Sequence, residues 1–366
     1  MSKTVLAVGL MSGTSLDGID AALIETDGEG FVRPVAFRGE RYSDSARATL
    51  KAATELALAF ESPRANPDIL AAEELVTRSH ILAVRKLLID AHVSPADVAV
   101  IGFHGQTIAH RPDRGWTWQI GDGASMAAAL GIPVINDLRA ADVAAGGQGA
   151  PLLPVYHRAL MAGQELPIAI LNLGGVGNLT WIGRDGELVA FDTGPANGLI
   201  DDWMLAKAGQ PFDQGGALAA TGRVDEAILK AMLDNPWFDQ PPPKSLDRSD
   251  FTMEPVRGLS PADGATTLTA FTAITVSYGL KLLPEPPKRL IVAGGGRHNA
   301  TLMTMLGEAC GVVPEPIETY GWNGDATEAE GFAYMAVRSL NGKPISFPGT
   351  TGAPEPLTGG VLHKAA

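Results

Sequence analysis

The same run of local patterns occurs twice in this sequence, at about residue 5 and again at about residue 168. In each copy an apolar segment enters a glycine-bearing loop, a second apolar segment follows, and an Asp-Gly turn leads into a third. Short apolar runs bounded by turn residues are typical of β-strands, and Asp-Gly pairs favour hairpins. The strands are predicted at residues 4–10, 19–25 and 32–38 and at residues 166–173, 179–182 and 187–191. Two such units facing each other would leave a cleft lined by two glycine loops.

Helix-like and strand-like segments alternate through the remaining sequence. This alternation predicts an α/β fold in which helices flank a central mixed sheet in each of two duplicated domains. Further strands are predicted at residues 98–103 and 132–136, and helices at residues 45–60, 68–92, 198–208, 224–233, 266–283, 297–310 and 326–340.

The domain limits follow from the positions of the two copies. The first domain is assigned residues 1–163 with the C-terminal helix and tail, 326–366, and the second is assigned residues 164–325. Hinges are expected near residues 162–166 and 321–326. Residues 235–257, which contain three consecutive prolines, are expected to form an irregular surface excursion, and the tail from residue 344 is expected to pack loosely.

Composition excludes several classes of protein. Among the 366 residues, 28 Lys and Arg face 41 Asp and Glu, a formal net charge of −13. This acidic balance argues against general binding to nucleic acid or to anionic membranes. The single cysteine, Cys310, excludes an intramolecular disulfide framework and a multi-cysteine zinc site. No window offers the roughly 18 apolar residues that a membrane span needs, so a cytoplasmic protein is expected.

The first glycine loop combines hydroxyls, glycines and carboxylates between two predicted strands. Residues 9–20 read GLMSGTSLDGID. Exposed backbone N–H groups of such a loop can donate to phosphate oxygens, and the hydroxyls of Ser12, Thr14 and Ser15 can add to that cradle. The loop lacks the Gly-Lys-Ser/Thr ending and the following helix of a Walker A motif. The alternative is a plain hairpin turn, which rarely contains so many polar side chains.

Three other glycine-rich stretches follow predicted strands. Residues 171–178, LNLGGVGN, have few large side chains near the turn, so their backbone could approach a ligand closely. Residues 291–299, IVAGGGRHN, run from a buried strand into a helix whose N-terminus could hold a diphosphate. Residues 144–151, AAGGQGAP, precede a helix predicted to open near Pro151. Each stretch alone is weak evidence, because other folds contain similar runs.

Two carboxylate settings are candidates for chemistry. Asp192 in FDTGPAN is predicted at the end of a strand, where an acid emerging into a cleft is well held as a general base. The alternative for Asp192 is a turn or helix-capping role. Arg139 stands between Asp137 and Asp142, where it could bind a substrate carboxylate or form a surface ion pair. His104 is predicted just after a strand, and a lone histidine is more often structural than catalytic.

The sequence resembles the 1,6-anhydro-N-acetylmuramic acid kinase family in six segments. In chain order these segments are GLMSGTSLDGID, FHGQT, ADVAAGGQGAPLLP, LNLGGVGN, FDTGPAN and AGGGRHN. The resemblance runs from about Val8 to about Ala333, and its first and third segments are the most specific. It implies the ribonuclease H-like, actin-like ATPase fold of the acetate and sugar kinase, Hsp70 and actin superfamily, whose two duplicated domains close over ATP. One departure is Ala196, where the GPxN turn is expected to have a glycine.

The resemblance also implies a reaction and its residues. ATP, water and the anhydro sugar would give ADP and N-acetylmuramic acid 6-phosphate in the recycling of bacterial cell-wall fragments, with Mg²⁺ as the metal and a homodimer as the assembly. Asp192 would be the general base that activates water, and Asp17 would hold Mg²⁺ directly or through water. ATP contacts are expected from Ser12, Gly13, Thr14, Ser15, Leu16, Asp17, Gly18, Ile19, Asp20, Gly174, Gly175, Asn178, Gly294, Gly295 and Gly296. Sugar contacts are expected from His104, Gln106, Arg139, Asp142, Gly147, Gln148 and Glu328.

Two other functions stay open at the level of sequence. A different sugar or acyl kinase on the same fold would share the ATP loops and differ at the sugar side. An ATP-dependent switch protein related to actin or Hsp70 would have no small substrate, although 366 residues leave no room for a separate peptide-binding domain.

Overall fold

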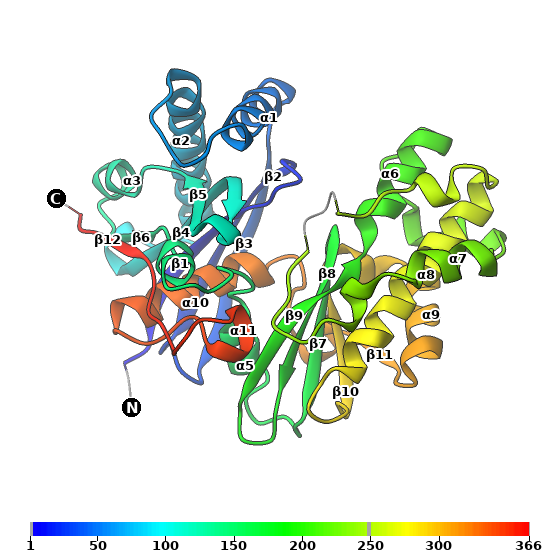
Figure 1. Cartoon of the computed structure of the whole chain (residues 1–366). Coiled ribbons are helices and arrows are strands. Elements are labelled where there is room, and N and C mark those ends of the chain that lie inside the picture. The colour runs from blue at the N-terminus through cyan, green and yellow to red at the C-terminus, as the bar shows by residue number, and fades with distance from the viewer. Residues whose placement is uncertain (1–2, 247–249, 366) are drawn as a thin grey trace. The chain divides into compact units, whose positions relative to one another are not determined.

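A computed structural model describes residues 3–246 and 250–365 of the chain (Figure 1). The chain divides into two compact units: unit 1 comprises Met1–Ala162 and Ala326–Ala366, and unit 2 comprises Gly163–Asp325. The limits expected from the sequence differ from this division by one residue, at the first junction. None of the helices in the described part of the chain is long and apolar enough to cross a bilayer.

Unit 1 is built on a seven-stranded sheet in the order β12-β6-β4-β1-β2-β3, with β5 paired to β4. The first three strands form an antiparallel meander, and β4 and β6 run parallel to β1. The strands are β1 (Val5–Ser12), β2 (Gly18–Thr26), β3 (Val32–Arg41), β4 (Val98–Arg111), β5 (Trp116–Ile120), β6 (Val134–Asn136) and β12 (Val361–His363).

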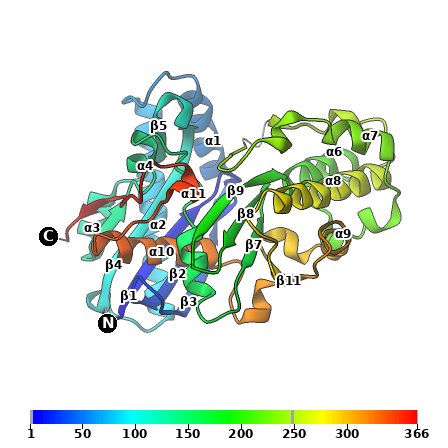
Figure 2. The same ribbon diagram turned by 60° about the horizontal axis from the view of Figure 1, so that its bottom comes forward.

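Helices cover both faces of this sheet (Figure 2). Val8 and Leu10 of β1 pack into a core that the first two helices share, whereas Gly9, which points to the other face, meets α10. A Cβ on Gly9 would lie 1.8 Å from the Ala329 carbonyl oxygen, so only glycine lets α10 approach the sheet this closely. The helices are α1 (Asp44–Leu58), α2 (Pro67–Asp90), α3 (Gly123–Leu130), α4 (Ala140–Ala144), α5 (Pro154–Leu160), α10 (Thr327–Leu340) and α11 (Pro348–Thr351).

Unit 2 contains a five-stranded sheet in the order β11-β10-β7-β8-β9. Its first three strands again form an antiparallel meander, and β10 and β11 run parallel to β7. The strands are β7 (Ile168–Leu173), β8 (Val176–Ile182), β9 (Leu188–Pro195), β10 (Arg289–Ala293) and β11 (Pro314–Pro316).

The helices of unit 2 form two apolar cores. One face of the sheet packs on α8 and α9, and a second core joins α8 to α6 and α7. The central helix α8 lies in both cores, and most of its residues are buried. The helices are α6 (Asn197–Ala208), α7 (Glu226–Leu233), α8 (Pro261–Lys281) and α9 (Ala300–Cys310).

The two sheets share one topology. The order β3-β2-β1-β4-β6 in unit 1 corresponds to β9-β8-β7-β10-β11 in unit 2, with the same parallel and antiparallel neighbours. A three-stranded meander with parallel strands added beside its first strand is the ribonuclease H-like arrangement. The predicted fold class, α/β with a duplicated ribonuclease H-like sheet, is confirmed.

The helix signals in the sequence act where they were expected. Helix α2 begins at Pro67, whose missing N–H needs no partner in the first turn. The Asn66 side chain caps this helix by accepting from the N–H groups of Asp68 and Ile69. The helix predicted at residues 68–92 therefore begins one residue earlier than expected, at Pro67.

Several strand predictions near the glycine loops were wrong in extent. Strand β4 continues through FHGQT to Arg111 because its second half pairs with β5, so His104 lies within a strand and not after it. Residues 176–178, predicted in a turn, belong to β8, which leaves Gly174 and Gly175 as the turn. Asp192 was predicted at a strand end, but β9 continues beyond it to Pro195.

The prediction that the tail packs loosely was wrong. Strand β12 pairs with β6, and Ser346 forms a bridge with Leu357. The Thr351 hydroxyl also donates to the Asp142 carboxylate at 2.6 Å. Backbone pairing and this buried hydrogen bond fix the tail although its composition is typical of a loop.

Other differences concern where helices begin and what is buried. The helix predicted near Pro151 begins at Pro154, and the helix predicted from residue 297 begins at Ala300, after a 3₁₀ turn. Strand β5 and helix α3 were not predicted. Within the expected surface excursion at 235–257, Phe238 and Val256 are buried in the core of unit 2. Residues 247–249 of that excursion lie outside the described residues.

Candidate active site

The first glycine loop joins β1 to β2 and exposes a short run of polar side chains. The Leu16 N–H donates to the Gly13 carbonyl at 3.2 Å, which closes the turn. Leu16 has a φ of 57°, in the left-handed region, while its side chain packs against the core of unit 1. Thr14, Ser15 and Asp17 are exposed, and the Ser15 hydroxyl donates to the Asp17 carboxylate at 2.7 Å. The loop therefore presents two hydroxyls and one carboxylate to solvent.

Ser12, at the start of this loop, points inward. Its side chain is buried, with the hydroxyl 2.5 Å from Oε1 of Gln106 and 3.1 Å from the hydroxyl of Tyr42. Gln106 itself has no exposed surface. Of the positions in this segment that the resemblance assigns to ATP, the last three lie in β2: Gly18, Ile19 and Asp20.

Another group of predicted site residues gathers around Arg139, just before α4. Nε of Arg139 donates to Nε2 of His104 at 3.0 Å, and Nη1 donates to the Gly149 carbonyl at 2.8 Å. Burial lowers the pKa of Arg139 to about 10, against the opposing effect of the nearby Glu328 carboxylate. Burial raises the pKa of Glu328. The positive charge of Arg139 opposes this shift, and the negative charge of Asp17 adds to it. Arg139, Glu328 and Asp17 therefore interact electrostatically within unit 1.

His104 is a neutral support for Arg139. Its side chain is buried, its ring packs 4.6 Å from that of Phe332, and Nδ1 lies 2.9 Å from the Gly105 carbonyl. Burial and the Arg139 charge hold the pKa of His104 well below its usual range. Nδ1 therefore carries the proton and donates to Gly105, while Nε2 accepts from Arg139.

Asp142 organises the loop that contains Gly147 and Gln148. One carboxylate oxygen accepts from the Gly149 N–H at 2.6 Å, and the other accepts from the Thr351 hydroxyl at 2.6 Å. The Gln148 N–H donates to the Thr351 carbonyl at 2.7 Å. Because both carboxylate oxygens bind atoms of the chain, Asp142 shapes this loop from inside.

In unit 2, the turn between β7 and β8 contacts the start of α6 through its backbone. The Gly174 carbonyl accepts from the Asn197 N–H at 3.0 Å, and the Gly175 carbonyl accepts from the N–H groups of Ala196 and Gly198. The Asn197 side chain donates back to the Leu173 carbonyl at 2.9 Å. The turn and the helix start are thus held as one piece.

Two of the three consecutive glycines after β10, Gly294 and Gly296, pack against the end of β7, next to the same turn. Gly294 has a φ of 74°, and a Cβ there would lie 2.4 Å from Oδ1 of Asn172. A Cβ on Gly296 would lie 2.6 Å from the Leu173 side chain. Gly295 is exposed and borders a pocket with a volume of about 580 Å³. This pocket is lined by Asn197, Ile200, Asp201, Phe212, Asp213, Gln214, Gly215, Gly295, His298 and Asn299.

Asp192 lies on β9 in a row of polar residues that crosses three strands. It pairs with Asn178 of β8, which pairs in turn with Asn172 of β7, so the three side chains share one face of the sheet. The Leu246 N–H donates to Oδ2 of Asp192 at 2.8 Å. Burial raises the pKa of Asp192 to about 7, and the Leu246 hydrogen bond opposes that shift. A carboxyl with this pKa can exchange a proton near neutral pH.

Ala196, the departure from the family pattern, is accommodated. Its φ is −121°, outside the left-handed region, and its methyl group is fully buried. The Ala196 N–H still donates to the Gly175 carbonyl at 3.0 Å. The contact between the β7–β8 turn and α6 therefore persists with alanine at this position.

The structure also brings in residues that the sequence analysis did not assign. Tyr42, Thr351 and Leu246 each hydrogen-bond to a predicted site residue, and Phe212 borders the pocket of unit 2. No local motif marks Tyr42 or Leu246, and Thr351 lies in the tail that was expected to be loose. Asn197 could have been found from the sequence, because it is the last residue of the FDTGPAN segment.

Two carboxylates in unit 1, those of Asp17 and Glu328, are the groups that could hold a divalent cation. Asp17 is exposed and accepts a hydrogen bond from Ser15. Its charge raises the pKa of Glu328. No group of three or more His, Cys, Asp or Glu side chains suited to a metal occurs among residues 3–246 and 250–365. Mg²⁺ in phosphoryl-transfer sites is commonly held by one or two carboxylates together with substrate phosphates and waters. The residues present fit that mode of binding.

Two ribonuclease H-like units in one chain, one with a hydroxyl-bearing loop and the other with glycine loops beside a pocket, define the actin-like ATPase fold class. The family model for anhydro-N-acetylmuramic acid kinase matches residues 5–365. The chain belongs to the anhydro-N-acetylmuramic acid kinase family, a family of kinases.

Curated relatives carry the same name. The anhydro-N-acetylmuramic acid kinase of Rhizorhabdus wittichii is 71% identical over 361 residues, 98% of this chain and 99% of that protein. The one from Zymomonas mobilis is 55% identical over 363 residues, 98% of this chain and 100% of that protein. The resemblance stated from the sequence is therefore confirmed. Among solved structures, component A of the Acidaminococcus fermentans (R)-2-hydroxyglutaryl-CoA dehydratase has a TM-score of 0.49 at 13% identity, over 92% of this chain and 99% of that chain. So distant a likeness carries no argument about activity.

Proposed function

We propose that this chain opens the 1,6-anhydro ring of anhydro-N-acetylmuramic acid and phosphorylates O6, with ATP as donor and N-acetylmuramic acid 6-phosphate and ADP as products. Membership of the anhydro-N-acetylmuramic acid kinase family supports the choice of the anhydro sugar as substrate. The observation that carries the mechanism is Asp192, whose pKa is raised by burial to about 7. The proposal includes a role in peptidoglycan recycling in the bacterial cytoplasm, and a homodimer as the assembly.

The ring opening has the character of glycoside hydrolysis. Asp192 takes a proton from water, the water oxygen attacks C1, and the bond between C1 and O6 breaks, as in an inverting glycosidase. O6 then forms its new bond to the γ-phosphorus, and the bond from that phosphorus to the β,γ-bridging oxygen breaks to release ADP. A base is most effective when its pKa lies near the working pH, which is the condition that burial creates for Asp192.

For the nucleotide, we assign one role to each unit. The exposed turn of the first loop, with Thr14 and Ser15, binds phosphate oxygens through its backbone N–H groups and hydroxyls. The pocket bordered by Gly295 and Phe212 in unit 2 holds the nucleoside. Mg²⁺, held by Asp17 and with Glu328 nearby, would neutralise triphosphate charge.

Arg139 is the candidate for the carboxylate of the sugar's lactyl group. Its Nε and Nη1 are oriented by His104 and Gly149, which leaves Nη2 for a ligand. A guanidinium held in a fixed plane suits recognition of a carboxylate. His104, Gly149 and the loop shaped by Asp142 would then set its direction.

The test is to incubate the purified protein with Mg-ATP and anhydro-N-acetylmuramic acid. We expect equal amounts of ADP and a product whose mass is that of the anhydro sugar plus water plus a phosphoryl group. Glucose, N-acetylglucosamine and acetate serve as acceptors for the alternative kinases. ADP release with one of these acceptors and none with the anhydro sugar would contradict the proposal.

A further inference from the structure

Gln106 is fully buried in unit 1, and both N–H donors of its side chain amide are in use. Its Oε1 accepts from the Ser12 hydroxyl at 2.5 Å. Its Nε2 donates to the Gly13 carbonyl at 3.1 Å and to the Thr107 carbonyl at 3.3 Å. An amide nitrogen has two hydrogens to donate, so no donor is left for a sugar hydroxyl. These contacts join Gln106 to the first loop and not to solvent.

A β-bulge aims Gln106 at that loop. Along the parallel pair β1 and β4, Leu10 faces Phe103 but Ser12 faces Gln106, so β4 contains one residue more than β1 between these pairs. Gly105, in the bulge, has a φ of 73°, and a Cβ there would lie 2.5 Å from a carbonyl oxygen of β5. Bulges next to functional sites commonly redirect side chains in this way.

Tyr42 anchors the same loop from its other end. Its hydroxyl lies 3.1 Å from the Ser12 hydroxyl, and its backbone N–H donates to the Asp17 carbonyl at 3.1 Å. Burial raises the pKa of Tyr42 to about 12, so the hydroxyl stays protonated. Gln106 and Tyr42 together fix Ser12, Gly13 and Asp17, on either side of the exposed turn.

We propose that Gln106 is a positioning residue for the nucleotide phosphates. Together with Tyr42, Gln106 holds residues 12–17 of the first loop in a shape in which the backbone N–H groups of the loop point at the phosphates. This inference rests on the proposed function, and it replaces the sugar contact that the resemblance implies for Gln106. The Gly13 carbonyl accepts two hydrogen bonds, from Nε2 of Gln106 and from the Leu16 N–H. Loss of the Gln106 donor removes the bond that ties this carbonyl to β4, which displaces the loop rather than the sugar residues around Arg139.

The main test is Gln106→Glu, which keeps the shape and the acceptor for Ser12 but removes the donor to Gly13. The KM for ATP is expected to rise about tenfold or more, while the KM for the anhydro sugar stays within about twofold. A protonated carboxyl can donate to Gly13 again. The kcat/KM for ATP of the variant, divided by that of the wild type at the same pH, is therefore expected to increase as the pH falls from 8 to 6.

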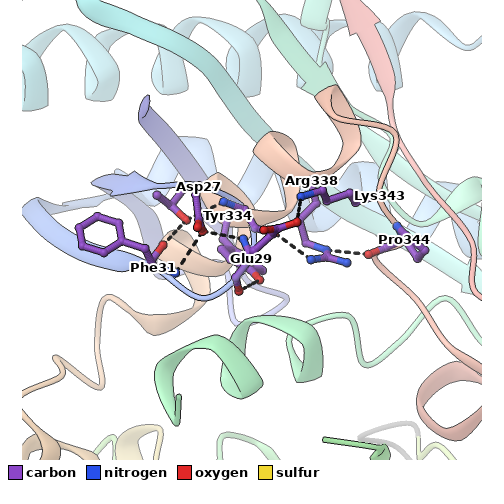
Figure 3. Close-up of polar contacts among 9 residues, drawn as sticks. Asp27, Glu29, Phe31, Tyr334, Arg338, Lys343 and Pro344 are labelled. Atoms are coloured by element: carbon purple, nitrogen blue, oxygen red, sulfur yellow. Dashed lines mark hydrogen bonds and ion pairs between the residues drawn. The ribbon is translucent and has the colours of Figure 1, made fainter. Parts of the chain in front are cut away.

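Thr26→Val is the matched control for loss of a buried hydrogen bond. Thr26 pairs with Val5 at the other end of the β1–β2 hairpin, and its hydroxyl donates to the Phe31 carbonyl at 2.6 Å. The turn next to it is anchored on α10, as Figure 3 shows: Tyr334 donates to the Glu29 carbonyl at 2.7 Å. This variant is expected to lower Tm and to leave the KM for ATP unchanged.

Tyr42→Phe is the second variant, since it removes one hydroxyl and keeps the ring and the backbone bond to Asp17. The KM for ATP is expected to rise by a smaller factor, about two- to fivefold. If Gln106→Glu does not fold, Tyr42→Phe decides the proposal alone. An unchanged KM for ATP in each folded variant would overturn the positioning role. A rise in the KM for the sugar alone would overturn it in favour of direct sugar contact.

Titration with ATP in the absence of sugar separates this inference from the proposed function. The wild type is expected to bind Mg-ATP by calorimetry, and Gln106→Glu to bind it about tenfold more weakly. Equal affinity of wild type and variant would overturn the role of Gln106 and leave the kinase proposal standing. No binding of Mg-ATP by the wild type would overturn both.

Discussion

The loops that follow the first strand of each sheet have the same place in the topology but are held by different means. In unit 1, the loop between β1 and β2 is fixed from inside by the side chains of Ser12, Gln106 and Tyr42. In unit 2, the turn between β7 and β8 is two glycines long and is fixed by backbone hydrogen bonds to Asn197 and by close packing of Gly294.

This difference teaches that one strand order can support two ways of fixing the loop that follows its first strand. A loop fixed by side chains can keep exposed hydroxyls and a carboxylate, as at Thr14, Ser15 and Asp17. A loop fixed by glycine packing leaves space beside it, as at the pocket bordered by Gly295. The acids differ as well, because Asp17 is exposed whereas burial raises the pKa of Asp192.

The largest effect is expected from Asp192→Asn, compared with Asp17→Asn in the other unit. Removal of a general base costs about 10²–10⁴ in rate, so kcat should fall at least a hundredfold for Asp192→Asn while binding of ATP and sugar persists. Asp17→Asn should act mainly on the KM for Mg-ATP. Steady-state kinetics with both substrates measures this. A kcat near the wild-type value for Asp192→Asn would remove it from the role of base.

The next effect is the pH dependence that Asp192 imposes. Below its pKa of about 7 the carboxyl is protonated and cannot accept a proton from water. The kcat/KM for the sugar should therefore decline as the pH falls through 7, by about tenfold for each pH unit well below it. A rate profile from pH 5 to 8 checks this. A profile that stays flat down to pH 5 would mean that no group with this pKa limits the reaction.

A smaller effect is expected from Gly294→Ala in the loop fixed by glycine packing. The added methyl would lie 2.4 Å from Oδ1 of Asn172, on a backbone with a φ of 74°. Such strain costs about 1–3 kcal/mol, so the free energy of unfolding should fall by that amount and ATP should bind more weakly. Denaturant unfolding and nucleotide titration measure the two effects. Unchanged values would show that this loop can relax.

The smallest effect is expected from Gly13→Ala in the loop fixed by side chains. A Cβ on Gly13 would make only an ordinary contact, 3.4 Å from the Ser15 hydroxyl. The free energy of unfolding should change by no more than about 0.5 kcal/mol, and the KM for ATP by less than about twofold. A loss of unfolding free energy as large as that of Gly294→Ala would contradict the proposed difference in how the two loops are held.

The sequence predicts the repeated strands well because apolar segments and turn residues are local signals. Pro67 and Asn66 mark a helix start by the same local chemistry. What it could not predict depends on partners far along the chain. Strand β4 extends through His104 because β5 pairs with it, and the tail is ordered because Thr351 reaches Asp142.

In the candidate site, too, local features could be predicted from the sequence and features that depend on distant residues could not. The position of Asp192 on a strand of unit 2 and the glycines of both units could be read from motifs. The inward direction of Ser12 could not, because it depends on Gln106, which a bulge redirects. Nor could the pKa of Asp192, which depends on burial and on a hydrogen bond from Leu246, a residue outside every quoted motif.

The central claim is that water, activated by Asp192, opens the sugar bridge while the freed oxygen accepts the phosphoryl group. The most direct measurement is a short reaction in ¹⁸O-labelled water, followed by mass spectrometry of the product fragments. Unlabelled product kept in the same water for the same time corrects for exchange at C1. The account predicts one ¹⁸O at C1 of N-acetylmuramic acid 6-phosphate and none in its phosphoryl group. Label in the phosphoryl group, or an unlabelled C1, would contradict it.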